Sequence, residues 1–131
     1  MSHTALFARE PFAALASPGP HPDAANAAML KVVGELDLAG VPELDYELRR
    51  AEAHATLVVV DLRELEFIDT SGACLLLQAH RRVRSAGGRM LVVRGPAEVE
   101  WFLALIGIDR ELELVDWPRI EHSAPSEEVA A

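Results

Sequence analysis

One short polar run is the place in this chain where side chains could do chemistry. It reads Phe67-Ile68-Asp69-Thr70-Ser71-Gly72 and sets a carboxylate beside two hydroxyls. Asp, Thr and Ser are all good helix N-caps, so the simplest interpretation is the start of a helix. A helix N-terminus also favours a phosphate, through its free N–H groups and its dipole. The run therefore predicts an N-cap that is also compatible with a phosphate group.

Hydrolase chemistry fits this run poorly. Aspartic proteases carry Asp-Thr-Gly or Asp-Ser-Gly in an all-β subunit, whereas here Ser71 stands between Thr70 and Gly72 and a helical pattern follows. Ser71 lies outside the Gly-x-Ser-x-Gly pattern, and the helical spacing places His80 on the outer side of the helix, too far away to act as its base. A Gly-rich phosphate loop ending in lysine is also absent from the sequence. We therefore expect no enzyme, no catalytic residue, no cofactor and no metal.

The composition excludes further classes of protein. The 131 residues suffice for one domain, and the single cysteine, Cys74, can form neither an internal disulfide nor a multi-cysteine zinc site. We expect Cys74 to be a small buried core residue. A net charge of -9 opposes nucleic-acid binding. The sequence shows neither an apolar run near the ~18 residues of a membrane span nor a signal-peptide start, which predicts a cytoplasmic protein.

The elements that position the polar run follow from the hydrophobic periodicity. Strand patterns alternate with helix patterns, which predicts an α/β fold with a mainly parallel sheet. The expected strands cover 29–36, 57–62, 90–93 and 112–115, and the expected helices cover 41–55, 71–86 and 97–106. The apolar run at 57–62 is typical of a strand buried on both faces. The inward residues expected on the helices are Val41, Leu44, Leu48, Ala51 and Ala55, then Ala73, Leu76, Ala79, Val83 and Ala86, and last Val99, Phe102, Leu103 and Ile106.

Loops at the carboxyl ends of parallel strands meet at one edge of the sheet. Residues 63–70 form an unusually long connection of this kind, in which Phe67 and Ile68 are expected to pin the chain to the core. Residues 37–41 follow the first strand and are expected at the same edge. The polar run and Asp37 should therefore lie close together.

The chain divides into three parts by composition. Residues 1–28 hold four of the eight prolines, which predicts an exposed loop after a possible edge strand at 4–9. Residues 29–116 form the folded core, and residues 117–131 form a proline-broken tail. A basic cluster, Arg81, Arg82 and Arg84, ends the second helix. We interpret this cluster as a solvated face that favours the negative end of the helix rather than as a nucleic-acid site.

The order and spacing of these motifs resemble the STAS domain, and most closely the bacterial anti-sigma factor antagonists. The resemblance covers residues 29–116 and rests on five short motifs. These are Gly34-Glu35-Leu36-Asp37, Val59-Val60-Asp61-Leu62, the polar run 67–72, Gly87-Gly88-Arg89-Met90-Leu91-Val92-Val93 and Leu105-Ile106-Gly107-Ile108-Asp109. It implies a small mixed, mainly parallel sheet of four to five strands with three to four helices, and an N-terminal edge strand.

The resemblance also implies a phosphorylation-controlled switch in bacterial transcription regulation, typically of a stress response. The unphosphorylated antagonist would bind an anti-sigma factor with a GHKL-type serine/threonine kinase fold and free a sigma factor. Phosphorylation would end binding, and a PPM-type phosphatase would reset the protein. Ser71 matches the acceptor position, with Thr70 as second choice, and the implied partner surface includes Asp37, Asp69, Thr70, Ser71 and Gly72.

Three departures from the family pattern stand out. The loop through Pro18–Pro22 is longer than the usual hairpin connection, Cys74 replaces a commonly aliphatic residue, and a final amphipathic helix is not evident after 115. STAS domains also serve as accessory subunits of ABC-type lipid transport systems and as stressosome-like scaffolds. These are the alternative functions.

Overall fold

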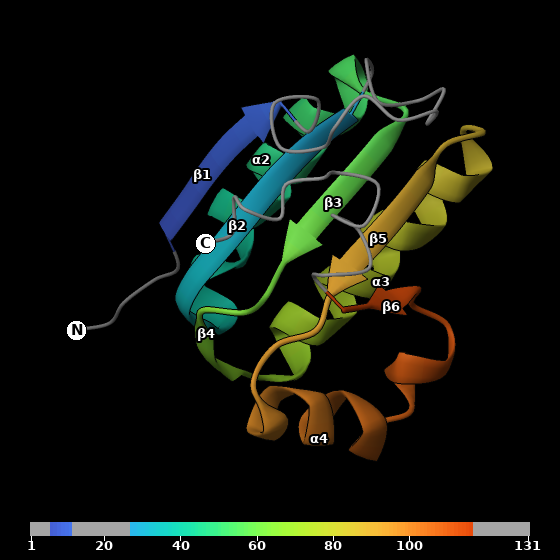
Figure 1. Ribbon diagram of the computed structural model, residues 1–131. Coiled ribbons are helices and arrows are strands. Elements are labelled where there is room, and N and C mark those ends of the chain that lie inside the picture. Colours follow the sequence, from blue (N-terminus) through green and yellow to red (C-terminus); the bar gives the residue numbers. More distant parts are fainter. Residues whose placement is uncertain (1–5, 12–26, 117–131) are drawn as a thin grey trace.

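The computed structural model describes residues 6–11 and 27–116, which form a single sheet with helices on one face and at one end (Figure 1). The expected proline-rich loop and C-terminal tail lie outside these residues. In chain order the elements are β1 (Leu6–Pro11), β2 (Ala27–Leu36), the 3-10 turn η2 (Leu38–Gly40), α2 (Val41–His54), β3 (Leu57–Asp61), β4 (Leu65–Ile68), α3 (Thr70–Ser85), β5 (Arg89–Val93), α4 (Ala97–Leu105), the 3-10 turn η3 (Ile108–Arg110) and β6 (Leu114–Val115).

The sheet has the strand order β1-β2-β3-β5-β6, and β4 pairs with β2 beyond the end of β3. β1 is antiparallel to β2, and the other pairings are parallel. The expected mainly parallel α/β fold with an N-terminal edge strand is thus confirmed. The described part holds one strand more than the expected four to five, because β4 is a strand where we expected an irregular connection.

A change of register in β2 makes room for β4. β2 pairs with β3 as far as Lys31, opposite Asp61, and with β4 from Gly34 onward. The register shifts between Gly34 and Glu35, and Gly34 has a φ of 92°, a left-handed conformation that favours glycine. β2 thereby reaches past β3 and carries the chain to the site at the carboxyl edge.

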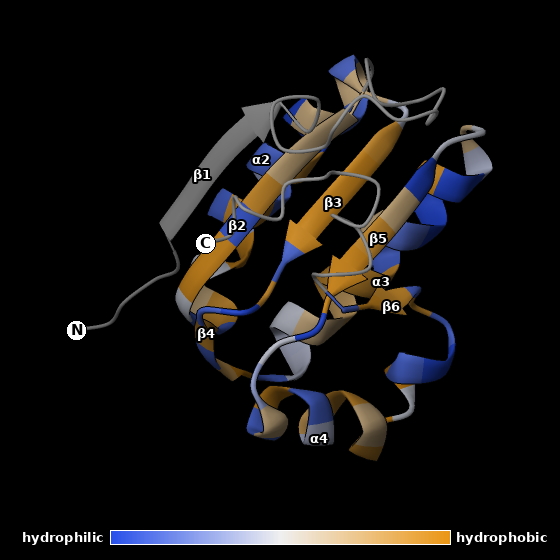
Figure 2. Ribbon diagram, viewed as in Figure 1, coloured by the Kyte–Doolittle hydropathy of each residue, from blue (hydrophilic) through white to orange (hydrophobic). Residues whose placement is uncertain are grey.

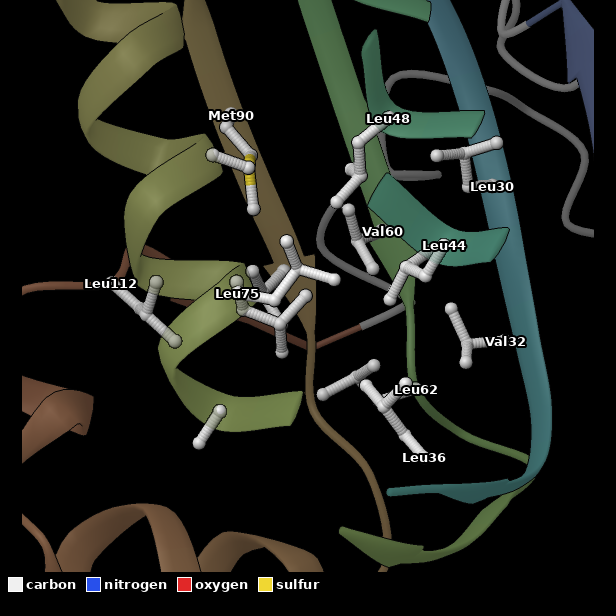
Figure 3. Close-up of a cluster of buried hydrophobic side chains, with 14 of the residues drawn as sticks. Leu30, Val32, Leu36, Leu44, Leu48, Val60, Leu62, Leu75, Met90 and Leu112 are labelled. Atoms are coloured by element: carbon white, nitrogen blue, oxygen red, sulfur yellow. The ribbon is translucent and has the colours of Figure 1, made fainter. Parts of the chain in front are cut away.

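The core lies mainly between the sheet and helices α2 and α3. Side chains such as Leu30, Val60 and Met90 meet Leu44 and Leu75 there (Figure 3). Alternate residues of the same strands form a second, smaller buried cluster on the opposite face. All five residues of β3 are buried, as the continuous apolar run predicts. Figure 2 shows most of this strand in the hydrophobic colour.

The helices largely bury the faces that their spacing predicts: two of the predicted inward residues are exposed, and Val41, Ala55 and Phe102 are only partly buried. Leu44, Leu48 and Ala51 of α2, Ala73, Leu76, Ala79 and Val83 of α3, and Val99 and Leu103 of α4 are buried. Ala86 is exposed after the end of α3, and Ile106 is 36% exposed after the end of α4. Phe67 is 50% exposed, so it does not pin the chain, whereas Ile68 is buried. β4 exposes its two middle residues, and Phe67 is one of them.

His80 lies inside the protein, which corrects the expected outer position. It is 3% exposed, and neither ring nitrogen has a hydrogen-bond partner within the described residues. It lines a hollow with Arg84, Met90 and Glu111, because β5 and the segment after η3 cover this side of α3. Burial lowers the pKa of His80 below its usual value, and Arg84 lowers it further, against the opposing effect of Glu111 and Glu113.

The basic cluster is held in ion pairs between elements. Arg81 binds Glu111 at 2.7 Å, and Arg82 binds Glu52 of α2 at 2.7 Å. These pairs leave two of the three arginines committed to carboxylates of the same chain. None of the described helices combines the length and apolar character needed to cross a membrane.

His80 should make stability depend on pH. Its folded pKa is lowered, so between that pKa and about 6.5 the unfolded chain binds more protons, and stability falls as pH falls from 7 toward 5.5. Replacement by Leu removes an unpaired buried polar group. We expect His80→Leu to raise the free energy of unfolding by about 1 kcal/mol and to flatten this pH dependence. Denaturant unfolding at several pH values measures both effects. The control is His54→Gln, which replaces an exposed histidine and should keep the pH dependence of wild type. If the free energy of unfolding changes with pH equally in His80→Leu and in wild type, His80 is not the cause of the pH dependence.

Candidate functional site

The site begins where β4 ends and α3 starts. Asp69 lies between them with extended backbone angles, and its Oδ1 accepts a hydrogen bond from the Gly72 N–H at 3.0 Å. Asp69 is therefore the N-cap, one of the three residues that the sequence offered for this role. Thr70 is the first residue of the helix and does not cap it.

The second carboxylate oxygen of Asp69 joins the helix to the turn after β2. Oδ2 accepts a hydrogen bond from the Leu38 N–H at 3.2 Å, and the Asp69 N–H donates to the Leu36 carbonyl at 3.1 Å. Asp37, next to Leu38, caps η2: its Oδ1 accepts from the Ala39 N–H at 3.1 Å. The structure thus brings Asp37 and Asp69 to one edge of the sheet, as predicted.

Thr70 and Ser71 present hydroxyls at the first turn of α3. Thr70 is exposed and Ser71 is partly buried, and neither hydroxyl has a hydrogen-bond partner within the described residues. The first N–H groups of a helix lack partners in the helix itself. Two hydroxyls therefore lie at the positive end of a 16-residue helix, on a turn fixed by Asp69.

Gly72 is buried and sets the distance between α3 and β2. A Cβ at this position would lie 2.6 Å from Cγ and 2.9 Å from the carbonyl oxygen of Leu36. Any side chain here would push the first turn of the helix away from β2. Gly72 thus allows the first turn of α3 to pack closely on β2, while Thr70 and Ser71 form the surface of the site.

Two residues next to the site are exposed although the sequence did not predict it. Cys74 is exposed one turn after Thr70, so the expectation of a buried core residue was wrong. Leu38 is 71% exposed beside Asp69. The exposure of Leu38 could have been inferred from the sequence, because it is an apolar residue in a polar turn directly after Asp37. The residues around Cys74 at the start of α3 contain no feature that indicates its exposure.

The described residues give no support to a metal centre at this edge. Among residues 27–116, no group of three or more His, Cys, Asp and Glu side chains could hold a metal ion. What the site offers is a rigid turn with two free hydroxyls, two carboxylates engaged in backbone hydrogen bonds, and an exposed leucine. This arrangement suits contact with another protein and modification of a hydroxyl.

Solved structures with similar folds support this architecture. SpoIIAA in its unphosphorylated form is 20% identical with a TM-score of 0.60, and the match covers 95% of this chain and 94% of that one. An anti-sigma factor antagonist from Mycobacterium paratuberculosis is 22% identical with a TM-score of 0.63, covering 97% and 89%. The match to SLC26A9 has 14% identity and a TM-score of 0.64, and covers 76% of this chain and 19% of that one. Likeness at such identities shows a shared fold.

The sequence comparisons identify the family. No curated protein is similar enough in sequence to count as a relative. A family model described as "Mlab, STAS domain" matches residues 22–116, which include β2 to β6 and the whole candidate site. Since this match spans most of the 131 residues, the chain belongs to the STAS domain family.

Proposed function

We propose that this protein is an anti-sigma factor antagonist that is switched by phosphorylation of Ser71. In the unphosphorylated form it binds an anti-sigma factor with a GHKL-type kinase fold and releases a sigma factor. A PPM-type phosphatase restores the form that binds, and the cycle takes place in the bacterial cytoplasm, where ATP is available. The observation that carries the proposal is the fixed first turn of α3, where the hydroxyls of Thr70 and Ser71 lack partners within the described residues.

The geometry suits a kinase substrate whose fold survives modification. A phosphate on Ser71 would add about -1.5 to -2 charges at pH 7. The positive end of α3 offsets part of this charge, typically by roughly 0.3–1 kcal/mol. Asp69 already holds the turn through Gly72 and Leu38, and within residues 27–116 the Ser71 hydroxyl makes no hydrogen bond that the modification would break. The effect would therefore fall on the partner, whose nucleotide phosphates would repel the new charge.

Ser71 is preferred over Thr70 because it matches the acceptor position of the family that the chain resembles. Thr70 is the more exposed of the two, and the cap at Asp69 leaves its hydroxyl available as well. Thr70 is therefore the second choice, and site mapping by mass spectrometry separates the two residues.

The alternative function uses the same edge with a different partner. As an accessory subunit of an ABC-type lipid transport system, or as a stressosome-like scaffold, the protein would bind through the start of α3 without a phosphorylation cycle. A pull-down that recovers an ATP-binding kinase-like anti-sigma factor supports the switch. Recovery of an ABC ATPase supports the alternative.

The switch predicts a clear contrast between two Ser71 variants. Ser71→Ala should bind the kinase like wild type and gain no phosphate on incubation with kinase and ATP. Ser71→Asp should bind about a hundredfold more weakly, which corresponds to about 3 kcal/mol. Its circular dichroism spectrum should be unchanged, because the hydroxyl makes no hydrogen bond within the described residues. Calorimetry and intact-mass analysis measure these effects, with Thr70→Ala as the matched control. Phosphate mapped to Thr70 alone would show that Ser71 is not the acceptor. Wild-type affinity of Ser71→Asp would show that a negative charge at this position does not end binding.

The two aspartates should affect binding and stability in different proportions. Asp69→Ala removes the cap of α3 and should cost about 1–2 kcal/mol of stability. Asp69→Asn keeps one amide oxygen for the Gly72 N–H, but its NH2 group cannot accept from Leu38. We expect Asp69→Asn and Asp37→Ala to weaken kinase binding about tenfold with smaller losses of stability than Asp69→Ala. Thermal unfolding and calorimetry separate the two effects. Wild-type affinity in both variants would show that the surface lies elsewhere.

A further inference from the structure

Large apolar side chains gather in exposed positions at the carboxyl end of the sheet. Leu38 is 71% exposed, Phe67 50%, Trp101 64% and Leu105 62%. They come from η2, β4 and α4, three elements that lie at the same end of the molecule (Figure 1). Single exposed apolar residues need no explanation, but a group at one end of a small domain is typical of an interaction surface.

The pairing of β2 with β4 fixes which residues face outward here. Leu36 and Ile68 are register partners, and both are buried. Glu35 and Phe67 are register partners one residue earlier, and both are exposed. Neighbouring residues of a strand point to opposite faces, so Glu35 and Phe67 share the outer face. Leu38 lies two residues after Leu36, in η2, and its backbone N–H is fixed by a hydrogen bond to the Asp69 carboxylate.

Helix α4 continues this surface. Val99 and Leu103 point into the core, whereas Glu98, Trp101 and Leu105 recur at spacings of three and four on another face. Glu98 lines a hollow together with Leu65 and Glu66 of β4, beside Phe67. The exposed face of α4 therefore adjoins the exposed face of β4, and Figure 2 shows the apolar segments of α4 at this end of the molecule.

Exposed carboxylates lie on the same elements or on neighbouring ones. Glu35 of β2, Glu43 of α2, Glu66 of β4 and Glu98 of α4 are exposed, and none has an ion pair within the described residues. Arg63 also lines the hollow, but it binds the buried carboxylate of Asp61. Farther along α3, Arg81 and Arg82 are paired with acids of other elements. Within the described residues, this end of the molecule thus combines exposed apolar side chains with four carboxylates that lack an ion pair, and Arg110 of η3 is an exposed cation next to α4.

We propose that Leu38, Phe67, Trp101 and Leu105, rimmed by Glu35, Glu43, Glu66 and Glu98, form an acid-rimmed apolar docking surface. Its occupant is a protein whose contact face has apolar side chains surrounded by lysine and arginine. Interfaces of this kind bury apolar and aromatic anchors at the centre, while charges at the rim speed association. An anionic membrane is disfavoured, because the carboxylates would be repelled by its surface. The inference rests on the proposed function, since the occupant is the kinase that acts on Ser71.

The test uses the full chain, a candidate GHKL-type anti-sigma factor and ATP. The double variant Trp101→Ser, Leu105→Ser should bind roughly 30-fold more weakly, as expected when interface anchors are lost. It should raise the KM for phosphorylation of Ser71 and leave kcat unchanged, because the acceptor turn is intact. The matched control is Tyr46→Ser, which removes a 60% exposed aromatic residue from α2 and should bind like wild type. Circular dichroism and thermal unfolding confirm that each variant is folded.

The rim is tested separately through the rate of association. Changing Glu35, Glu43, Glu66 and Glu98 together to Gln should slow association about tenfold at low salt and flatten its salt dependence. If wild type binds the kinase and both multiple variants bind equally well, the docking surface is wrong and the proposed function stands. If wild type neither binds nor is phosphorylated by the kinase, both proposals fail. Two further results would overturn the proposed protein partner. If wild type binds phosphatidylglycerol vesicles and the double variant Trp101→Ser, Leu105→Ser does not, the surface binds a membrane. If wild type forms a dimer in sedimentation and the double variant does not, the surface binds a second copy of this chain.

Discussion

The carboxylate of Asp69 is the interaction on which the candidate site depends. One oxygen caps α3 through Gly72, and the other holds the turn after β2 through Leu38. Hydrogen bonds to an ionised carboxylate are stronger than neutral ones. The bond to Leu38 also joins two segments that lie 31 residues apart in the sequence. The same side chain therefore sets the direction of the helix, the position of the hydroxyls on its first turn and the exposure of Leu38. A phosphate could be added to such a turn without rebuilding the fold.

The second constraint is the close packing of the start of α3 on strand β2. β2 changes register at Gly34, leaves β3 and pairs with β4, so that α3 starts directly above Leu36. Gly72 allows this approach because a Cβ there would collide with Leu36. At this edge Leu36, Ile68 and Gly72 are buried, whereas Leu38, Phe67 and Thr70 are exposed. This division suits a protein that is recognised and modified by another protein.

The sequence predicts the parts of the molecule that depend on periodicity. The three helices, the buried strand β3 and the meeting of Asp37 with Asp69 follow from spacing and from the geometry of parallel strands. Residues whose environment depends on packing between elements could not be predicted in this way. His80 was expected on the outer side of α3, but it lies one turn after the buried Leu76, and β5 and the segment after η3 cover it. Phe67 and Cys74 are exposed although their types favour burial, because neighbouring elements leave both uncovered.

The central claim is that one phosphate on the first turn of α3 decides whether the partner binds. The most direct measurement compares the affinity of the unmodified protein for its anti-sigma factor with that of the enzymatically phosphorylated protein, purified and shown by mass spectrometry to carry one phosphate on Ser71. The phosphorylated protein should bind about a hundredfold more weakly and regain full affinity after treatment with a PPM-type phosphatase. Equal affinity of the two forms would contradict the central claim.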